Sequence, residues 1–183
     1  MKSTYSYIFA WLAAVAVAFG LAVVSPNDAS VMGKLPDFMS RTLLRQPVAV
    51  PEGLPSDRTL ALITFQRGQR AQVEGWINGL DLKNDRTISW MRMPVISDPG
   101  TLTGRDAAET KLLQHYPFEA ERANLVPVFA DRDSFARSAG LNGTDQVYVV
   151  VVNRRGDVLA RVEGEFDVEK AATLRETLKA QDL

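Results

Sequence analysis

The chain has 183 residues, which suits one globular domain of about 100–200 residues with a short appendage. Its 21 Lys and Arg nearly balance its 22 Asp and Glu, and the net charge of −1 provides no field that would attract nucleic acid, so nucleic-acid binding is not expected. The absence of cysteine excludes disulfide exchange, thiol-dependent peroxide reduction and thiolate metal binding.

Residues 1–25 predict a signal anchor or a signal peptide. Lys2 and the amino terminus precede an uncharged run at residues 7–24, which would span about 27 Å as a helix, close to the roughly 30 Å of a bilayer's hydrocarbon core. We favour an uncleaved anchor, and the alternative is cleavage at Ala16-Val17-Ala18. The positive-inside rule then predicts a domain that faces the periplasm from a bacterial inner membrane, or that is secreted to the periplasm after cleavage.

Residues 26–57 contain five prolines, a density that predicts a Pro-rich, semi-stiff linker. Within this segment, apolar residues recur at helical intervals between Leu35 and Leu44, which favours one short amphipathic helix. Such a helix would pack against its own domain or, as the less favoured alternative, lie on the membrane surface.

The folded domain is predicted at residues 58–183 and begins with an apolar run of strand length at 59–65. After the turn Gln66-Arg67-Gly68, apolar residues recur at three- and four-residue spacing as far as Leu80, so a helix is expected directly after the strand. Residues 87–96 have the composition of a second strand.

Residues 102–115 predict a helix with Thr103 as its N-cap, ended before a proline. An extended segment at 125–130 follows, and Asp131 or Asp133 can cap the short helix after it. Gly140 is a natural C-terminal stop for that helix.

The last third predicts a buried strand at 146–153, a hairpin turn, a partner strand at 158–162 and a closing helix at 168–179. The early strands need crossover connections, whereas the last two form a hairpin. Together these elements predict an α/β fold with mixed strand directions.

This order of elements resembles the thioredoxin-like fold over about 125 residues, from Asp57 to the C-terminus. Peroxiredoxin-like and membrane-tethered thioredoxin-like proteins have similar motifs in the same order. The matching segments are Val126-Pro127-Val128-Phe129-Ala130-Asp131, Ala139-Gly140-Leu141-Asn142-Gly143-Thr144-Asp145, Val147-Tyr148-Val149-Val150, Asn153-Arg154-Arg155-Gly156 and Glu163-Gly164. The resemblance implies a thioredoxin-like mixed sheet flanked by helices.

The chain departs from that family at the thiol site. The family places a CxxC pair at the turn from the first strand into the helix, and here Arg70 and Val73 stand near those positions. Where the family has a cis-proline beside the thiols, this chain has Asp145. The resemblance therefore implies a scaffold that has lost redox activity.

One subgroup accommodates these losses, the thioredoxin-like assembly factors of mitochondrial ATP synthase and similar bacterial proteins. The matches are Phe65, Trp76, Ala139-Gly140-Leu141-Asn142, Val147-Tyr148-Val149-Val150, Gly156, Gly164 and Leu174. The chain departs at Ala160-Arg161, where the subgroup has tryptophan, and at Asn153, where it has aspartate. This resemblance implies a protein partner in a membrane complex, and a role as an assembly factor or chaperone.

Catalysis is not expected. His115 is the only imidazole in the chain and lies at a predicted helix end, where a structural role is favoured. The remaining candidates are the carboxylate pairs Asp131 with Asp133 and Glu163 with Glu165. The first pair is better explained by helix capping and the second by a solvated strand end. No metal or cofactor motif is present.

Binding is the favoured function, and the candidate residues surround the empty thiol site: Arg67, Gln69, Arg70, Val73 and Asp145. Two arginines flank Gly68 at a helix N-terminus, where free N–H groups favour an anion or a partner's carboxylate, although solvated arginines are the simpler interpretation.

Four large residues, Trp76, Trp90, Met91 and Met93, would form either core or an exposed recognition patch, and core is favoured. We therefore expect a redox-inactive, membrane-tethered protein that binds partner proteins. The alternative is an enzyme or small-ligand binder with a non-thiol site in the same groove. A deep polar pocket would favour the alternative, and a shallow apolar patch would favour a partner surface.

Overall fold

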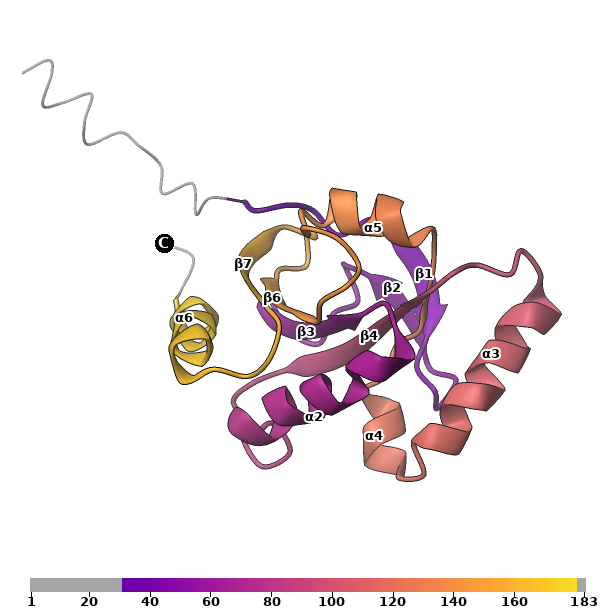
Figure 1. The fold of residues 1–183 in the computed structure, drawn as a ribbon, viewed down its shortest axis with the longest axis horizontal. Coiled ribbons are helices and arrows are strands. Elements are labelled where there is room, and N and C mark those ends of the chain that lie inside the picture. Colours follow the sequence, from indigo (N-terminus) through magenta and orange to yellow (C-terminus); the bar gives the residue numbers. More distant parts are fainter. Residues whose placement is uncertain (1–30, 181–183) are drawn as a thin grey trace, which may run out of the picture. The chain divides into compact units, whose positions relative to one another are not determined.

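The computed structural model describes residues 31–180, whose centre is a five-stranded mixed sheet in the order β5-β4-β3-β6-β7 (Figure 1). The strands are β3 (Thr59–Thr64), β4 (Trp90–Ile96), β5 (Val128–Phe129), β6 (Tyr148–Val152) and β7 (Val158–Glu163). β4 is parallel to β3 and β5, whereas β6 is antiparallel to β3 and β7. The predicted mixed α/β sheet is confirmed.

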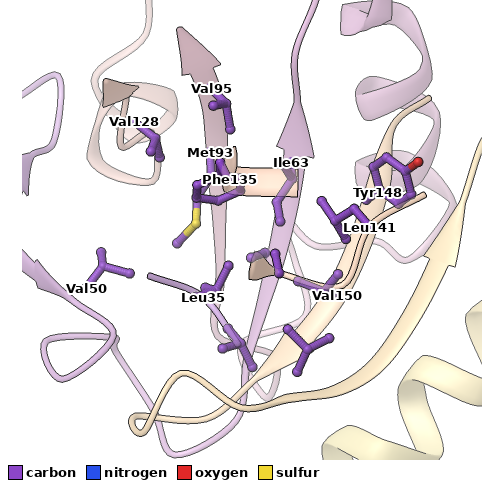
Figure 2. Close-up of a cluster of buried hydrophobic side chains, with 14 of the residues drawn as sticks. Leu35, Val50, Ile63, Met93, Val95, Val128, Phe135, Leu141, Tyr148 and Val150 are labelled. Atoms are coloured by element: carbon purple, nitrogen blue, oxygen red, sulfur yellow. The ribbon is translucent and has the colours of Figure 1, made fainter. Parts of the chain in front are cut away.

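Two hydrophobic clusters cover the two faces of this sheet. Helices α2 (Arg70–Gly79) and α6 (Val168–Lys179) lie on one side, and α5 (Arg132–Ser138) lies on the other (Figure 1). α2 contributes Trp76 to the cluster on its side of the sheet. α5 contributes Phe135 to the cluster on the other side, which also contains Leu35 from the N-terminal part of the domain (Figure 2). The central strands β3 and β6 are buried on both faces, which explains their continuous apolar sequences.

The predicted anchor at residues 7–24 lies outside the described residues. Between residues 31 and 180, no helix is both long enough and apolar enough to cross a membrane. The compact unit begins at Val31, so the later part of the expected linker, residues 31–57, belongs to the domain.

The short helix predicted between Leu35 and Leu44 is wrong. That segment contains β1 (Phe38–Arg41), which pairs antiparallel with β2 (Pro47–Val50). The apolar spacing was misleading because the chain reverses after β1, through a turn in which Arg45 has a φ of 65°. The buried side chains of this region join the domain's core instead of one helix face.

A strap at residues 32–35 fastens the start of the domain. Four backbone hydrogen bonds of 2.8–2.9 Å join it to β7, to the turn before β7 and to the end of α5. Gly33 passes so close to Ala139 that a Cβ at residue 33 would lie 2.3 Å from the carbonyl carbon of Ala139. The strap therefore requires glycine at this position.

The other helices are the 3₁₀ turn η1 (Arg67–Gln69), α3 (Leu102–His115) and α4 (Glu119–Ala123). The predicted bounds of α3 and α6 are confirmed, whereas the five-residue α4 was not predicted. The predicted cap of α3 is wrong, because the extended residue Thr101 accepts a 3.1 Å hydrogen bond from the N–H of Gly104. Asp131 caps α5 by accepting from the N–H of Ser134 at 2.8 Å. Hydrogen bonds from the side chain and then from the N–H of Ser134 lower the pKa of Asp131.

Candidate ligand-binding site

A pocket of about 860 Å³ lies between the N-terminal end of α2, the C-terminal ends of β3 and β4, and one face of α3. The carboxyl ends of parallel strands are a recurrent ligand position in open α/β sheets. The α3 residues that line the pocket are Gly104, Ala107, Ala108, Lys111, Leu112 and His115. Their spacing of three and four places them on a single helix face.

Small side chains on α3 keep this pocket open. Ala107 and Ala108 do not reach across to fill the space above the sheet, and Glu109 is the only buried residue of α3. A helix of this length would ordinarily bury an apolar stripe against the core. The inner face of α3 is instead the wall of the pocket.

Arginine contacts hold α3 in place. Near its N-terminus, Arg105 donates to Asp98 at 2.5 and 3.0 Å, and at its C-terminus the carbonyl of His115 accepts from Arg70 at 2.7 Å. Arg41 of β1 donates to Glu109 at 3.0 Å and also pairs with the neighbouring Asp106. These polar contacts position α3 without closing the pocket.

The lining of the pocket is cationic. It includes Arg67, Arg70, Arg92, Lys111 and Arg132, and in the described part of the chain no Asp or Glu lines it. The side chains come from η1, α2, β4, α3 and α5. Four separate parts of the sequence, the contiguous η1 and α2 together with β4, α3 and α5, thus place positive charge around one pocket.

Arg92 is the buried member of this group, with 2% of its surface exposed. Its Nη1 pairs with Glu74 of α2 at 2.6 Å, and its Nη2 lies 3.8 Å from Glu121 of α4. The centre of the Tyr116 ring lies 5.2 Å from the guanidinium carbon of Arg92 and 4.7 Å from that of Arg70. Nε and Nη2 of Arg92 have no hydrogen-bond partner. Pairing with carboxylates and aromatic contact offset the cost of burying this charge.

Gln69 fixes the turn from β3 into α2. Its buried side-chain oxygen accepts from the N–H groups of Phe65 and Gln66 at 2.8 and 3.1 Å, and its amide nitrogen donates to the carbonyl of Thr144 at 3.1 Å. Gln66 donates to Asp145 at 3.2 Å. These bonds fasten the turn to the loop before β6.

The five candidate residues from the sequence fall into two groups. Arg67, Arg70 and Val73 line the pocket, whereas Gln69 and Asp145 lie at the turn and do not line it. Sequence analysis missed three of the cations, Arg92, Lys111 and Arg132. Only Arg92 had a sequence signal, since it is a charged residue inside an apolar strand.

The other candidates from the sequence lie in the core, at the end of α3 or at the end of β7. The interpretation of Trp76, Trp90, Met91 and Met93 as core residues is confirmed, since all four are buried. Exposed His115 ends α3, as the structural interpretation expected, and borders the pocket. At the end of β7, Glu163 accepts from Asn142 at 3.1 Å.

The arrangement is suited to holding an anion. Among the described lining residues there is no carboxylate to act as a general base beside a nucleophile, and Thr64 is the only hydroxyl apart from the phenol of Tyr116. Arginine and lysine side chains recognise carboxylates and phosphates by charge-assisted hydrogen bonds.

Comparison with known proteins identifies the fold. No family model matches the sequence, and no curated protein does. A solved structure of BsSco, a member of the Sco family of cytochrome c oxidase assembly proteins, is similar with a TM-score of 0.53 at 15% identity, covering 79% of this chain and 91% of that one.

Two further solved structures are similar to this chain. The thioredoxin domain of a thiol-disulfide oxidoreductase from Bacteroides vulgatus has a TM-score of 0.52 at 13% identity, covering 82% of this chain and 99% of that one. The N-terminal domain of PilB from Neisseria gonorrhoeae has a TM-score of 0.51 at 12% identity, covering 78% and 89%. The domain described here therefore has a thioredoxin-like fold, and its sequence contains no cysteine with which to perform thiol chemistry.

Proposed function

We propose that this is a redox-inactive binding protein in which the pocket between α2 and α3 receives the ligand. The observation that carries the proposal is the position of the pocket. It is bordered by Arg70 and Val73, which stand near the positions where the resembling proteins have their two cysteines. The scaffold keeps an accessible site there without the sulfur atoms that thiol exchange requires.

We further propose that the ligand belongs to a partner protein and that residues 7–24 tether the chain to the membrane, facing the periplasm. Two observations support a role in the assembly of a membrane complex. The sequence resembles the ATP synthase assembly factors, and one structure with the same fold comes from a family of cytochrome c oxidase assembly proteins. On this proposal, a segment of the client subunit enters the pocket.

Crosslinked pulldown from solubilised membranes tests this function. Ala108→Trp would fill the pocket from the α3 wall, and Ala172→Trp on the exposed face of α6 is the matched control. We expect the wild type and the control to capture the same membrane-complex subunits, ATP synthase subunits among those scored, and Ala108→Trp to lose them. Equal capture by both variants would contradict a role for the pocket.

A second candidate is a small-ligand binder or an enzyme with a non-thiol site. The volume of about 860 Å³ favours it, because ligand pockets usually measure about 300–1,000 Å³. Metabolite profiling of material that copurifies with the chain tests this candidate. A small molecule retained by wild type and lost from Ala108→Trp would support it.

A further inference from the structure

We propose that the pocket between α2 and α3 recognises a ligand in which a carboxylate or phosphate group is joined to an apolar body. This inference rests on the proposed function only in taking the pocket as the binding site. It adds the chemical class of the ligand, which the fold alone does not specify.

The uncompensated cations of the pocket argue for the acidic group. Within residues 31–180, Arg67, Lys111 and Arg132 form no ion pair, and the buried Nε of Arg132 has no hydrogen-bond partner. Three positive side chains thus border one hollow without a carboxylate of the protein to balance them. An oxyanion in the pocket would supply the missing negative charge.

Arg92, a buried residue that lines the pocket, strengthens this argument. Nε and Nη2 form the edge of the guanidinium that a carboxylate or phosphate engages with two parallel hydrogen bonds. Both atoms lack a partner, because the Glu121 oxygen lies 3.8 Å from Nη2, too far for a hydrogen bond. A buried charge also acts through a medium of lower dielectric constant than water, so its potential in the pocket is weakly screened.

The rest of the lining argues for the apolar body. Val73, Pro94, Ala107, Ala108 and Leu112 contribute apolar surface between the charged groups. An inorganic anion would leave this surface in contact with water. A ligand with an alkyl or aryl portion would bury it, and such burial is favourable by about 25 cal/mol per Å² of apolar area.

Binding of matched probes to the purified full-length chain tests the proposal. The probes are dodecanoate, dodecyl phosphate, the neutral analogue dodecanol and inorganic phosphate, each titrated calorimetrically at low and high salt. We expect either alkyl anion to bind roughly tenfold or more tightly than dodecanol, and its affinity to fall as salt rises. Equal affinity for dodecanol, or inorganic phosphate binding as tightly as the alkyl anions, would overturn the proposal, and so would a lack of binding by both alkyl anions.

Charge variants locate the acidic group. Arg67→Gln with Lys111→Gln removes two exposed, unpaired cations of the pocket, and Arg86→Gln removes an exposed cation outside it. We expect the double variant to bind dodecanoate roughly twofold to thirtyfold more weakly while dodecanol is unaffected, which corresponds to about 0.2–1 kcal/mol for each of the two exposed charges removed. If Arg86→Gln weakened dodecanoate as much as the double variant, recognition within the pocket would be refuted.

Peptides separate the two sources of such a ligand. A short apolar peptide with a free C-terminal carboxylate and the same peptide with a C-terminal amide are titrated beside dodecanoate. Binding of the free acid but not the amide supports a partner's chain end as the ligand, and binding of dodecanoate alone supports a free small acid. Pulldown that depends on the pocket without any anion binding would refute the ligand class while leaving the proposed function intact.

Discussion

The two helices that face each other across the pocket are held by opposite means. α2 buries Val73, Trp76 and Ile77 against the sheet. α3 buries only Glu109, which pairs with Arg41, and two further arginines contact α3 near its two ends. A helix fixed by core packing has no free inner face. A helix held by polar contacts can leave its pocket-facing side free for a ligand. Three substitutions and one change of pH test whether α2 is held by core packing and α3 by polar contacts.

The largest effect is expected for α2. Trp76 is fully buried, donates to the carbonyl of Gly164 at 2.9 Å and packs edge-on against the Phe166 ring. Trp76→Ala should lower the free energy of unfolding by about 3–5 kcal/mol, since it removes a large core side chain. Urea denaturation measures this loss. A change below about 1 kcal/mol would mean that packing does not hold α2.

A smaller effect is expected where β1 holds α3. Arg41→Gln leaves the largely buried Glu109 carboxylate without its guanidinium partner. Because Arg41 is about one third exposed, we expect a loss of about 1–2 kcal/mol. Hydrogen exchange should localise the loss to α3. Arg137→Gln, at an exposed arginine that donates only to Ser134 at 3.0 Å, is the control and should leave α3 protected.

The N-cap of α3 offers a test with an internal control. Thr101→Ala removes the side-chain oxygen that accepts from Gly104 and should cost about 1 kcal/mol of stability. Thr103→Ala lies two residues further on, inside the helix, and should change stability by only a few tenths of a kcal/mol. Thermal unfolding of both variants compares them. A larger loss of stability in Thr103→Ala than in Thr101→Ala would mean that Thr103 is the N-cap.

The smallest effect is expected on acidification, when the carboxylate of Asp98 is protonated. Hydrogen bonds from Arg105 and from the N–H of Gly100 hold the pKa of Asp98 below its ordinary value. The resulting stabilisation is complete above an unfolded-state pKa of about 3.9 and is lost as the pH falls through the lowered folded-state pKa. The N-terminal turn of α3 should therefore lose exchange protection on acidification earlier than α2 does. In Asp98→Asn this pH dependence should disappear.

Much of the fold could be predicted from local sequence. β3, β6 and the helix from Val168 to Lys179 carry apolar patterns that indicate their own structure. The β1–β2 hairpin does not, because its contacts are distant: the hydroxyl of Ser40 donates to the carbonyl of Pro127 at 2.6 Å, and the N–H of Leu43 donates to the carbonyl of Leu125 at 3.1 Å. The prolines of this region predicted a linker. Pro47 nevertheless begins β2, because both strands of a two-stranded sheet are edge strands, where the missing N–H of proline is tolerated.

The candidate site was predicted only in part for the same reason. Arg67 and Arg70 lie at a recognisable strand-to-helix turn, so their position could be predicted from the chain alone. Lys111 and Arg132 come from helices that the topology brings beside this turn, and no local motif indicates it. Arg92 is the intermediate case. A charge within an apolar strand indicates a buried partner, but Glu74 and Glu121 become its partners only through packing.

The strap at residues 32–35 has a mechanical consequence if residues 7–24 anchor the chain as proposed. Tension transmitted from the membrane would reach the strap before it reached β1, and the strap's four hydrogen bonds to β7, the preceding turn and α5 would resist it. Arg41, which ties β1 to α3, lies further along the chain and would be shielded from the pull. Movement of the anchor would then load β7 and the C-terminal end of α5 before it loaded β1.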